Sequence, residues 1–207
     1  MRIAPPKQTA WKQPNKGWHS RGYLPHFDSV NEIQSLNFRL CDAVPMRLIE
    51  EWRRQLGWSR NLKQSDPRAV ALRQRIETHE DAGYGQCFLR DSRIATLTED
   101  ALQYFDGMRY RLLAWCVMPN HVHSLIEMVK AFSLGGILHS WKSYTAKKAN
   151  RILGRSGQFW DEDYYDRHIR DDDHLRIAIE YIEQNPVKAR LVTDATQWKY
   201  SSACRGQ

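Results

Sequence analysis

The order of the predicted elements, the alternation in the strands and the apolar stripes on the helices together predict an α+β fold of the ferredoxin-like, split βαβ type. Once a helical insertion at about residues 45–83 is set aside, the order is strand, helix, strand, strand, helix, strand and a final helix. The first six elements are the split βαβ pattern, in which an antiparallel sheet carries two helices on one face. A length of 207 residues and an apolar share of 42% suit one such domain with a buried core.

Four segments have the pattern of strands. In residues 33–41 apolar and polar side chains alternate, which predicts a half-buried strand. Residues 110–118 contain the longest apolar run and predict a continuous apolar strand, and the Pro119-Asn120 turn separates it from the next strand. The two remaining strands are expected at residues 121–128 and 164–169.

Five segments repeat apolar residues at helical spacing, and several of their ends carry start or stop signals. Asp66 and Pro67 are a typical N-cap and first helical position, and Gly107 is expected to stop the helix that begins near residue 91. Pro186 disfavours helical geometry at Asn185, so the last helix is expected to end there. The predicted helices are residues 46–56, 67–82, 91–107, 134–153 and 171–184.

The positive charge of the chain is concentrated in two blocks. The formal net charge is +7. Residues 1–27 hold five basic residues and residues 128–160 hold six, with no acidic residue in either block and with Trp and Tyr interleaved. Basic side chains neutralise phosphates and aromatic rings stack on unpaired bases, so the pattern suits nucleic-acid binding. It suits a solvated helix face and a tail equally well.

Other features exclude several classes of protein. The longest apolar run has seven residues, whereas a membrane helix needs about 20, and the first residues lack the apolar core of a signal peptide. The cysteines lie far apart without a CxxC pair, which argues against a structural zinc site and a disulfide scaffold. We expect a cytoplasmic, nucleoid-associated protein without membrane contact.

Two histidines are the first candidates for chemistry. Alternate residues of a strand point to the same face, so His121 and His123 lie side by side, while Val122, Ser124 and Ile126 take the other face. Two imidazoles presented in this way can bind one divalent cation. Alone, the pair is more often a pair of hydrogen-bonded histidines on a sheet surface.

The last helix carries the second set of candidates. Tyr181 and Asn185 follow His174 and Ala178 at spacings of three or four residues, which places all four on one side of the helix, beside the buried stripe. The carboxamide oxygen of Asn185 can ligate a hard cation. Taken alone, Tyr181 is more typical of the rim of an amphipathic helix and Asn185 of a C-terminal cap.

Three motifs together resemble the single-tyrosine HUH transposases, an insertion-sequence transposase family, and most closely its REP-associated tyrosine transposase branch. They are PNHVH at 119–123, FWDEDYYDRHIR at 159–170 and AIEYIEQNPVKARLV at 178–192. The resemblance covers roughly residues 90–203 well and the strand around 33–41 more loosely. Two histidines followed by a Tyr-x3-Asn-Pro helix are a far more specific signal than either part alone.

The resemblance implies roles for individual residues. His121 and His123 fill the metal-binding positions, and Asn185 fills the third ligand position, where more distant relatives carry Gln. Tyr181 fills the position of the catalytic tyrosine. The implied cofactor is a divalent ion, Mg²⁺ or Mn²⁺, and the implied activity is nicking and joining of single-stranded, palindromic hairpin DNA through a covalent 5′-phosphotyrosine. Such chemistry is physically reasonable, because a cation stabilises the charge on the phosphate while the tyrosine attacks.

Recognition of DNA is expected to use the two basic blocks. Residues 1–27 are expected to form a basic flexible arm, and residues 28–207 a single HUH transposase-like domain, acting as a monomer or homodimer. The side chains expected to contact DNA lie in the 128–160 block and in the arm: Lys142, Lys147, Lys148, Arg151, Arg155, Lys12 and Lys16.

Several alternatives stay open. Tyr144, Tyr164 or Tyr165 could supply the nucleophile in place of Tyr181, although Tyr181 is favoured by its helix placement. Tyr164 and Tyr165 alternate on a strand, so one is expected in the core and the other toward the site. A non-catalytic protein that binds hairpin DNA or structured RNA is the second functional hypothesis. A metal hydrolase of small molecules is disfavoured, because no further Asp or His ligands follow the histidine pair.

Overall fold

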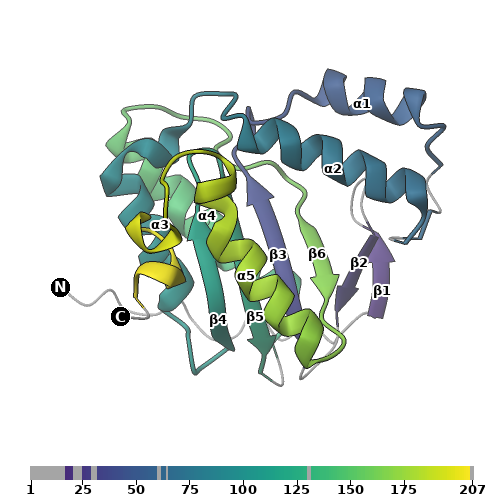
Figure 1. The fold of residues 1–207 in the computed structure, drawn as a ribbon. Coiled ribbons are helices and arrows are strands. Elements are labelled where there is room, and N and C mark those ends of the chain that lie inside the picture. The colour runs from purple at the N-terminus through teal and green to yellow at the C-terminus, as the bar shows by residue number, and fades with distance from the viewer. Residues whose placement is uncertain are drawn as a thin grey trace.

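A four-stranded antiparallel sheet lies at the centre of the molecule (Figure 1). In the sheet the strands follow the order β4-β5-β3-β6, and each pair of neighbours is antiparallel. This order is that of the split βαβ fold, which confirms the predicted fold class. The strands are β3 (Ile33–Arg39), β4 (Tyr110–Val117), β5 (His121–Met128) and β6 (Tyr165–His168). The structure is a computed structural model that describes residues 17–20, 25–28, 32–59, 62–63, 65–129 and 132–205.

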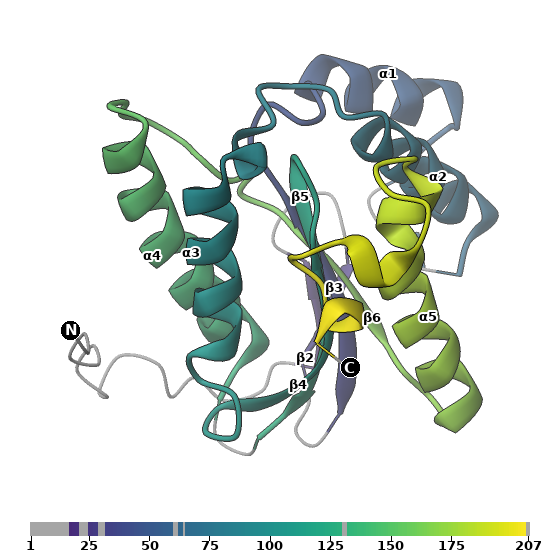
Figure 2. The same ribbon diagram turned by 60° about the vertical axis from the view of Figure 1, so that its left-hand side comes forward.

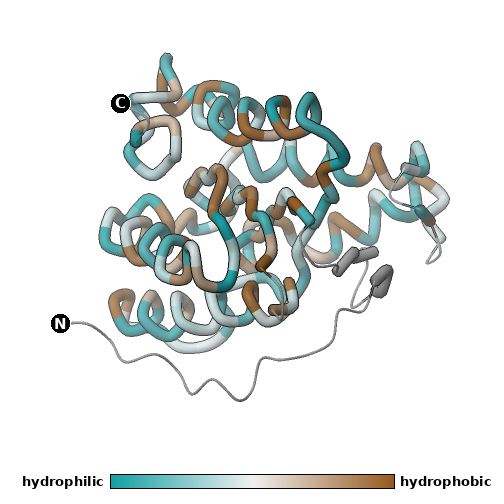
Figure 3. Tube along the Cα trace, turned by 90° about the horizontal axis from the view of Figure 1, so that it is seen from below, coloured by the Kyte–Doolittle hydropathy of each residue, from teal (hydrophilic) through white to brown (hydrophobic). Residues whose placement is uncertain are grey.

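Helices cover both faces of the sheet. α3 (Ser92–Gln103) and α4 (Leu134–Ile152) lie on one face, and α5 (Asp172–Lys188) lies on the other (Figure 2). Teal and brown stretches follow one another along the helical parts of the tube, as expected for helices with one buried side (Figure 3). Short 3₁₀ turns complete the chain at Phe88–Arg90, Ala195–Gln197 and Ser202–Cys204.

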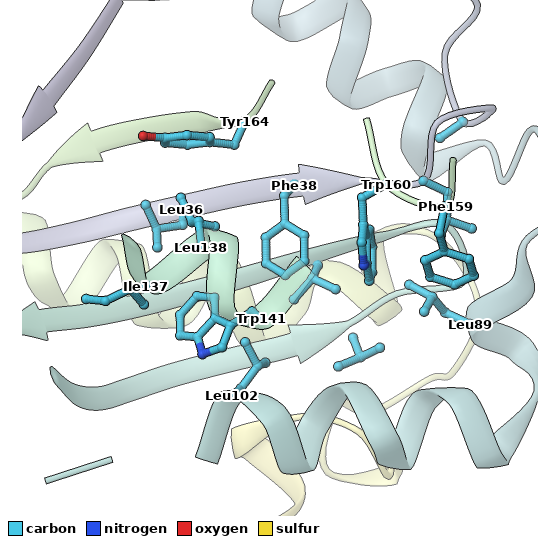
Figure 4. Close-up of a cluster of buried hydrophobic side chains, with 14 of the residues drawn as sticks. Leu36, Phe38, Leu89, Leu102, Ile137, Leu138, Trp141, Phe159, Trp160 and Tyr164 are labelled. Carbon is cyan, nitrogen blue, oxygen red and sulfur yellow. The ribbon is translucent and has the colours of Figure 1, made fainter. Parts of the chain in front are cut away.

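The apolar core lies between the sheet and the α3–α4 pair (Figure 4). The ring of Phe38 lies 6.2 Å from that of Trp141 and 4.9 Å from that of Trp160, measured between centroids. The Trp141 indole nitrogen donates to the Tyr110 hydroxyl at 2.9 Å, and this hydroxyl donates to the Leu102 carbonyl at 2.6 Å. The large aromatic rings are therefore buried with their polar atoms satisfied.

The predicted helical insertion is present as α1 (Met46–Gln55) and α2 (Pro67–Asp81), which cross one end of the sheet (Figure 1). Asp66 caps α2 by accepting from the backbone nitrogen of Arg68, as its position predicts. At the end of β3, the buried guanidinium of Arg39 lies 3.3 Å from Glu80 of α2 and 2.7 Å from Asp161. The buried ion pair between Arg39 and Glu80 joins the insertion to the sheet.

Two helix ends differ from the predictions. α3 ends at Gln103, and Gly107 instead takes a positive φ of 72° in the turn before β4. α5 continues past Asn185 to Lys188 with Pro186 inside its last turn, so the predicted end is wrong. A proline φ suits a helix, and near the end only one backbone hydrogen bond is missing. The Asn185 side chain also donates to the Tyr181 carbonyl at 2.6 Å, which ties down this turn.

The segment expected to be a flexible arm contains two strands. β1 (Gly17–Ser20) and β2 (Pro25–Asp28) form an antiparallel pair, and β2 lies beside β6 (Figure 1). Each strand has four residues, which is too short to show a clear alternation in the sequence. Lys12 and Lys16 lie outside the described residues.

The described part of the chain has no helix that is both long and apolar enough to cross a membrane. All four cysteines are free thiols, as their spacing predicts. Cys116 is fully buried, and burial raises the pKa of its thiol above the usual value, so it acts as a small apolar residue in the packing.

Candidate functional site

His121 and His123 begin β5 and face α5. Their Nε2 atoms lie 3.0 Å apart, and their rings meet edge to face with centroids 4.7 Å apart. Both side chains are buried, with exposed fractions of 1% and 4%. Val122, between them, packs into the core on the other face of the sheet, which confirms the predicted alternation.

Asn120 fixes the protonation of His121. The Asn120 amide nitrogen donates to the carbonyls of Glu80 at 3.1 Å and Tyr84 at 2.9 Å, so its Oδ1 is left to accept from His121 Nδ1 at 2.7 Å. His121 therefore carries its proton on Nδ1 and presents a lone pair on Nε2. Burial lowers the pKa of His121 well below its usual value and that of His123 to about 3. Both rings are neutral at pH 7, the form that binds metals.

The donor atoms fit one divalent cation. Two nitrogens held about 2.1 Å from an ion at a right angle are about 3.0 Å apart, which is the separation of the two Nε2 atoms. On α5, the Asn185 side chain is fully buried and its Oδ1 accepts no hydrogen bond from any residue that the structure describes. A buried carbonyl oxygen without a donor is suited to a hard cation. Within the described ranges no three His, Cys, Asp or Glu side chains form a metal cluster, so a site here depends on the amide.

Tyr181 projects from α5 beside the histidine pair. Its ring centroid lies 5.7 Å from that of His123, with the ring planes at 87°. The side chain is 37% exposed, so a phosphate group in solution can reach it. The Lys188 ammonium, near the end of the same helix, lies 5.4 Å from the Tyr181 ring centroid. α5 thus brings a partly exposed phenol and a cation to the histidines.

The helical insertion adds carboxylates that were not predicted as site residues. Asp81, the last residue of α2, lies 3.8 Å from His121 Nε2 and 2.9 Å from the Lys188 ammonium. Glu77, one turn earlier, lies close enough to Tyr181 for its negative charge to raise the pKa of the phenol. The four-residue spacing of the two acids, which puts them on one helix face, was the only sequence signal that could have found them.

These carboxylates set the electrostatics of the phenol. The pKa of Tyr181 is raised above its usual value, first by burial and then by the negative charges of Glu77, Asp81 and Glu80. Burial also raises the pKa of Glu77, while the positive charges of Arg73 and Lys188 oppose that rise. Tyr181 is therefore a neutral phenol in the metal-free protein.

The basic side chains expected to contact DNA have different surroundings. The Lys142 ammonium donates to the backbone carbonyls of Glu162 at 3.0 Å and Asp163 at 3.4 Å, and burial lowers the pKa of Lys142 to about 8. Arg155 donates to the Gln158 carbonyl at 3.1 Å. Both groups are turned to the protein's own backbone, which weakens the prediction that they contact phosphates.

The other predicted DNA contacts on α4 lie across the sheet from the histidines (Figure 2). Lys147 and Arg151 are exposed, and Lys148 is half-buried. The structure does not bring these three residues together with His121 and Tyr181. Their contacts with DNA stay predictions.

The rival tyrosines are distributed over both faces. Tyr164 is buried in the core on the α4 side (Figure 4), and Tyr144 lies on α4 itself. Tyr165 faces α2, where its hydroxyl accepts from Arg73 at 2.7 Å. The prediction that one residue of the pair is core and the other is not is confirmed. Tyr165 is the rival to Tyr181 that shares the neighbourhood of α2.

Part of the chain is similar to known proteins. Residues 86–185 match the model of the family described as "Transposase IS200 like". Over 103 residues the chain is 27% identical to a Haemophilus influenzae protein provisionally named REP-associated tyrosine transposase. That match takes in 45% of this chain and 58% of the relative, so less than two thirds of the relative's length is represented.

A solved structure shares the fold. It is described as a REP-associated tyrosine transposase bound to a REP hairpin, and it superposes with a TM-score of 0.53 at 15% identity. The superposition covers 90% of this chain and 82% of that one. The fold is thus shared with that structure, and residues 86–185 are similar to a transposase family. Just under half of the chain is similar to the IS200-like transposases, and the predicted resemblance to their REP-associated tyrosine transposase branch is confirmed.

Proposed function

We propose that this protein is a metal-dependent transposase that nicks and rejoins single-stranded hairpin DNA through a covalent 5′-phosphotyrosine on Tyr181. The observation that carries the proposal is the convergence of two neutral histidines, with Nε2 atoms 3.0 Å apart, and a partly exposed tyrosine on one face of the sheet. The family match and the hairpin in the name of the structural relative support DNA as the substrate.

His121, His123 and Asn185 are the residues that would hold Mg²⁺ or Mn²⁺. A bound ion at this position supplies Lewis-acid stabilisation of the negative charge that develops on the phosphate. The chain prepares the position in advance. Asn120 holds His121 in the tautomer that frees Nε2, and burial keeps both rings neutral.

Tyr181 is the proposed nucleophile. Its oxygen attacks the phosphorus, and the bond from phosphorus to the 3′ oxygen breaks, which leaves the 5′ phosphate on the tyrosine and a free 3′ hydroxyl. The phosphotyrosine keeps the energy of the broken bond. A 3′ hydroxyl of another strand can therefore reverse the step and join DNA without ATP.

Lys188 is placed to receive the DNA backbone. Its side chain is 51% exposed and is held by Asp81 at 2.9 Å, near the Tyr181 ring. A cation at this point attracts the phosphate that approaches the tyrosine. Lys147, Lys148 and Arg151, on the far side of the sheet, would contact another part of the same hairpin. A nucleoid-associated, cytoplasmic location and a monomeric or dimeric state stay predictions.

A denaturing gel tests the proposal. Single-stranded oligonucleotides with the imperfect palindromes that flank the gene are incubated with the protein and Mg²⁺ or Mn²⁺. A protein–DNA adduct that disappears with EDTA and with Tyr181→Phe is the expected result. A metal-independent gel shift without any adduct would overturn the proposal and indicate instead a protein that only binds hairpin DNA or structured RNA.

A further inference from the structure

The helical insertion carries an open groove, which we call the insertion groove. Figure 1 and Figure 2 show α1 outside α2, farther from the sheet. Trp52 of α1 lines the groove, together with residues of α2 at spacings of three or four and with Tyr84 just after that helix. The groove has a volume of about 510 Å³, which is within the range of small-ligand sites. All of its lining residues precede residue 86, so the groove lies outside the segment that matches the transposase family.

Three aromatic rings meet in the insertion groove. The His79 ring stacks on the Tyr84 ring, with centroids 4.2 Å apart and planes at 19°, and it meets Trp52 edge to face at 5.8 Å. Tyr84 is 56% exposed, and no other ring in the described part of the chain stacks on it. One face of the Tyr84 ring is therefore open to a ligand. Such a surface is suited to stacking on an unpaired nucleobase, because every base has a π face.

The insertion groove also carries a positive charge. Among the described residues that line it, Arg75 is a permanent cation and none is acidic. The Arg75 Nη1 donates to the neutral side chain of Gln55, on α1, at 2.7 Å, which orients the guanidinium and leaves its charge in place. A guanidinium binds phosphate oxygens in a forked geometry. The groove thus combines a stacking surface for a base with a cation for the backbone of a nucleic acid.

The insertion groove meets the candidate site at the end of α2. Ala82 lines the groove, whereas Asp81, the residue before it, lies 3.8 Å from His121 Nε2. The Tyr84 carbonyl accepts from the Asn120 amide at 2.9 Å, and Asn120 in turn orients His121. A strand with its scissile phosphate at the histidines therefore has to pass only the end of α2 to reach the Tyr84 ring.

We propose that the insertion groove binds an unpaired base of the single strand that adjoins the hairpin. The base stacks on the open face of Tyr84, and a phosphate of the same strand pairs with Arg75. Stacking accepts any base, so the groove adds affinity for a single-stranded flank more than it selects a sequence. The inference rests on the proposed function and gives the helical insertion a role in holding the substrate.

Fluorescence anisotropy in EDTA tests the inference with two oligonucleotides, the hairpin with a single-stranded DNA extension and the same hairpin without it. Tyr84→Ala should weaken binding of the extended hairpin about 10-fold and leave binding of the other unchanged. Tyr84→Trp keeps a stacking surface and should bind both as the wild type does. Tyr104→Ala removes another exposed tyrosine, at the end of α3, and is the matched control.

Two further measurements report on the contacts themselves. A 2-aminopurine base in the extension loses fluorescence when it stacks, so the wild type should quench it and Tyr84→Ala should not. Arg75→Gln should lower the slope of log Kd against log salt concentration by about 1 for the extended hairpin, because one phosphate contact is lost.

The outcomes separate this inference from the proposed function. Equal affinity of the wild type for the two oligonucleotides, or a Tyr84→Ala effect of the same size on both, would overturn the role of the groove. Adduct formation by the wild type would then leave the proposed function intact. Tighter binding of an RNA extension of the same sequence would overturn the assignment of the groove to DNA. Binding of the extension through Tyr84 without any wild-type adduct would support the groove and overturn the proposed function.

Discussion

The two faces of the central sheet are built from the same strands but differ in character. On the α3–α4 face, Phe38 of β3 and Val122 of β5 pack into a large aromatic core. On the α5 face, His121 and His123 flank Val122 in the same strand. Because successive side chains of a strand point in opposite directions, three consecutive residues supply both core and site. Stability and chemistry are therefore separable by substitution, although they share a backbone.

The α5 face is itself divided. Near the histidines it is polar and receives Asp81 from α2 and Lys188 from α5. Further along the strands it is apolar, with a smaller cluster that includes Ala114, Leu125 and Ile182. The site is thus confined to the end of the sheet that the insertion covers. The apolar half of this face packs against α5 and holds it on the sheet, while the last turns of α5 carry the side chains of the candidate site.

Removing a core ring from the apolar face should have the largest effect on stability. Phe38 is 1% exposed and contacts two tryptophan rings, so Phe38→Ala should lower the free energy of unfolding by about 3–5 kcal/mol. Urea unfolding of both proteins at 25 °C measures this difference in the free energy of unfolding. Adduct formation per folded molecule should not change. A variant that is as stable as the wild type, or folded but inactive, would break the separation between the faces.

The polar face should make the metal-free protein sensitive to acid. The folded-state pKa of each buried histidine lies below the value of about 6.5 in the unfolded chain, so the stability they contribute is present above pH 6.5 and is lost as the pH falls. Between pH 7 and pH 5.5 the loss from both is about 2.5 kcal/mol. The neighbours Lys188 and Arg39 strengthen the shift of His121.

Urea unfolding in EDTA at the two pH values measures this effect. His123→Gln should halve the loss of stability between pH 7 and pH 5.5, whereas His139→Gln, on α4, should leave this loss unchanged. An equal loss of stability in His123→Gln and in the wild type would show that the polar face does not hold its histidines neutral.

Asn185 is expected to act as a metal ligand through its buried Oδ1, and a substitution separates this role from that of a helix cap. Asn185→Ala should weaken Mn²⁺ binding by about 10–100-fold, as loss of a group at a metal site typically does. Gln184→Ala removes a neighbouring, exposed amide and is the matched control. Calorimetric titration with Mn²⁺ measures both. Unchanged affinity in Asn185→Ala would restrict the metal site to the two histidines.

A change at the far end of the insertion should have the smallest effect. Asp66 caps α2 through its 2.9 Å bond to the Arg68 nitrogen, and Asp66→Ala should cost about 1 kcal/mol of stability. Asp66→Asn keeps a capping oxygen and should cost less. Because α2 is joined to the sheet at its other end by Glu80, adduct formation should persist. A large loss of adduct formation would show that a change at the start of α2 is transmitted to the site.

The sequence allowed most of the fold and part of the site to be predicted. Alternation along β5 placed His121 and His123 on one face, and helical spacing placed Tyr181 and Asn185 on one side of α5, because both depend only on local periodicity. The continuation of α5 through Pro186 could not be foreseen, since the Asn185 side chain supports that turn.

Contacts between distant segments were beyond the sequence. Glu77 and Asp81 join the site because Arg39 anchors α2 over the end of the sheet, some 40 residues away in the chain. The Lys142 ammonium, expected to contact DNA, donates to two backbone carbonyls beside Asp161, and its contact with DNA stays a prediction. Neither outcome follows from periodicity, charge or motif spacing.

The most direct test of this account is to locate the DNA on the protein. The adduct formed with hairpin DNA and Mn²⁺ is digested with nuclease and trypsin, and the peptide that carries the nucleotide is identified by mass spectrometry. Cleavage after Arg176 and Lys188 isolates Tyr181 in residues 177–188, whereas Tyr164 and Tyr165 lie together in residues 156–167. The account predicts the nucleotide on Tyr181. A nucleotide on residues 156–167 would contradict it.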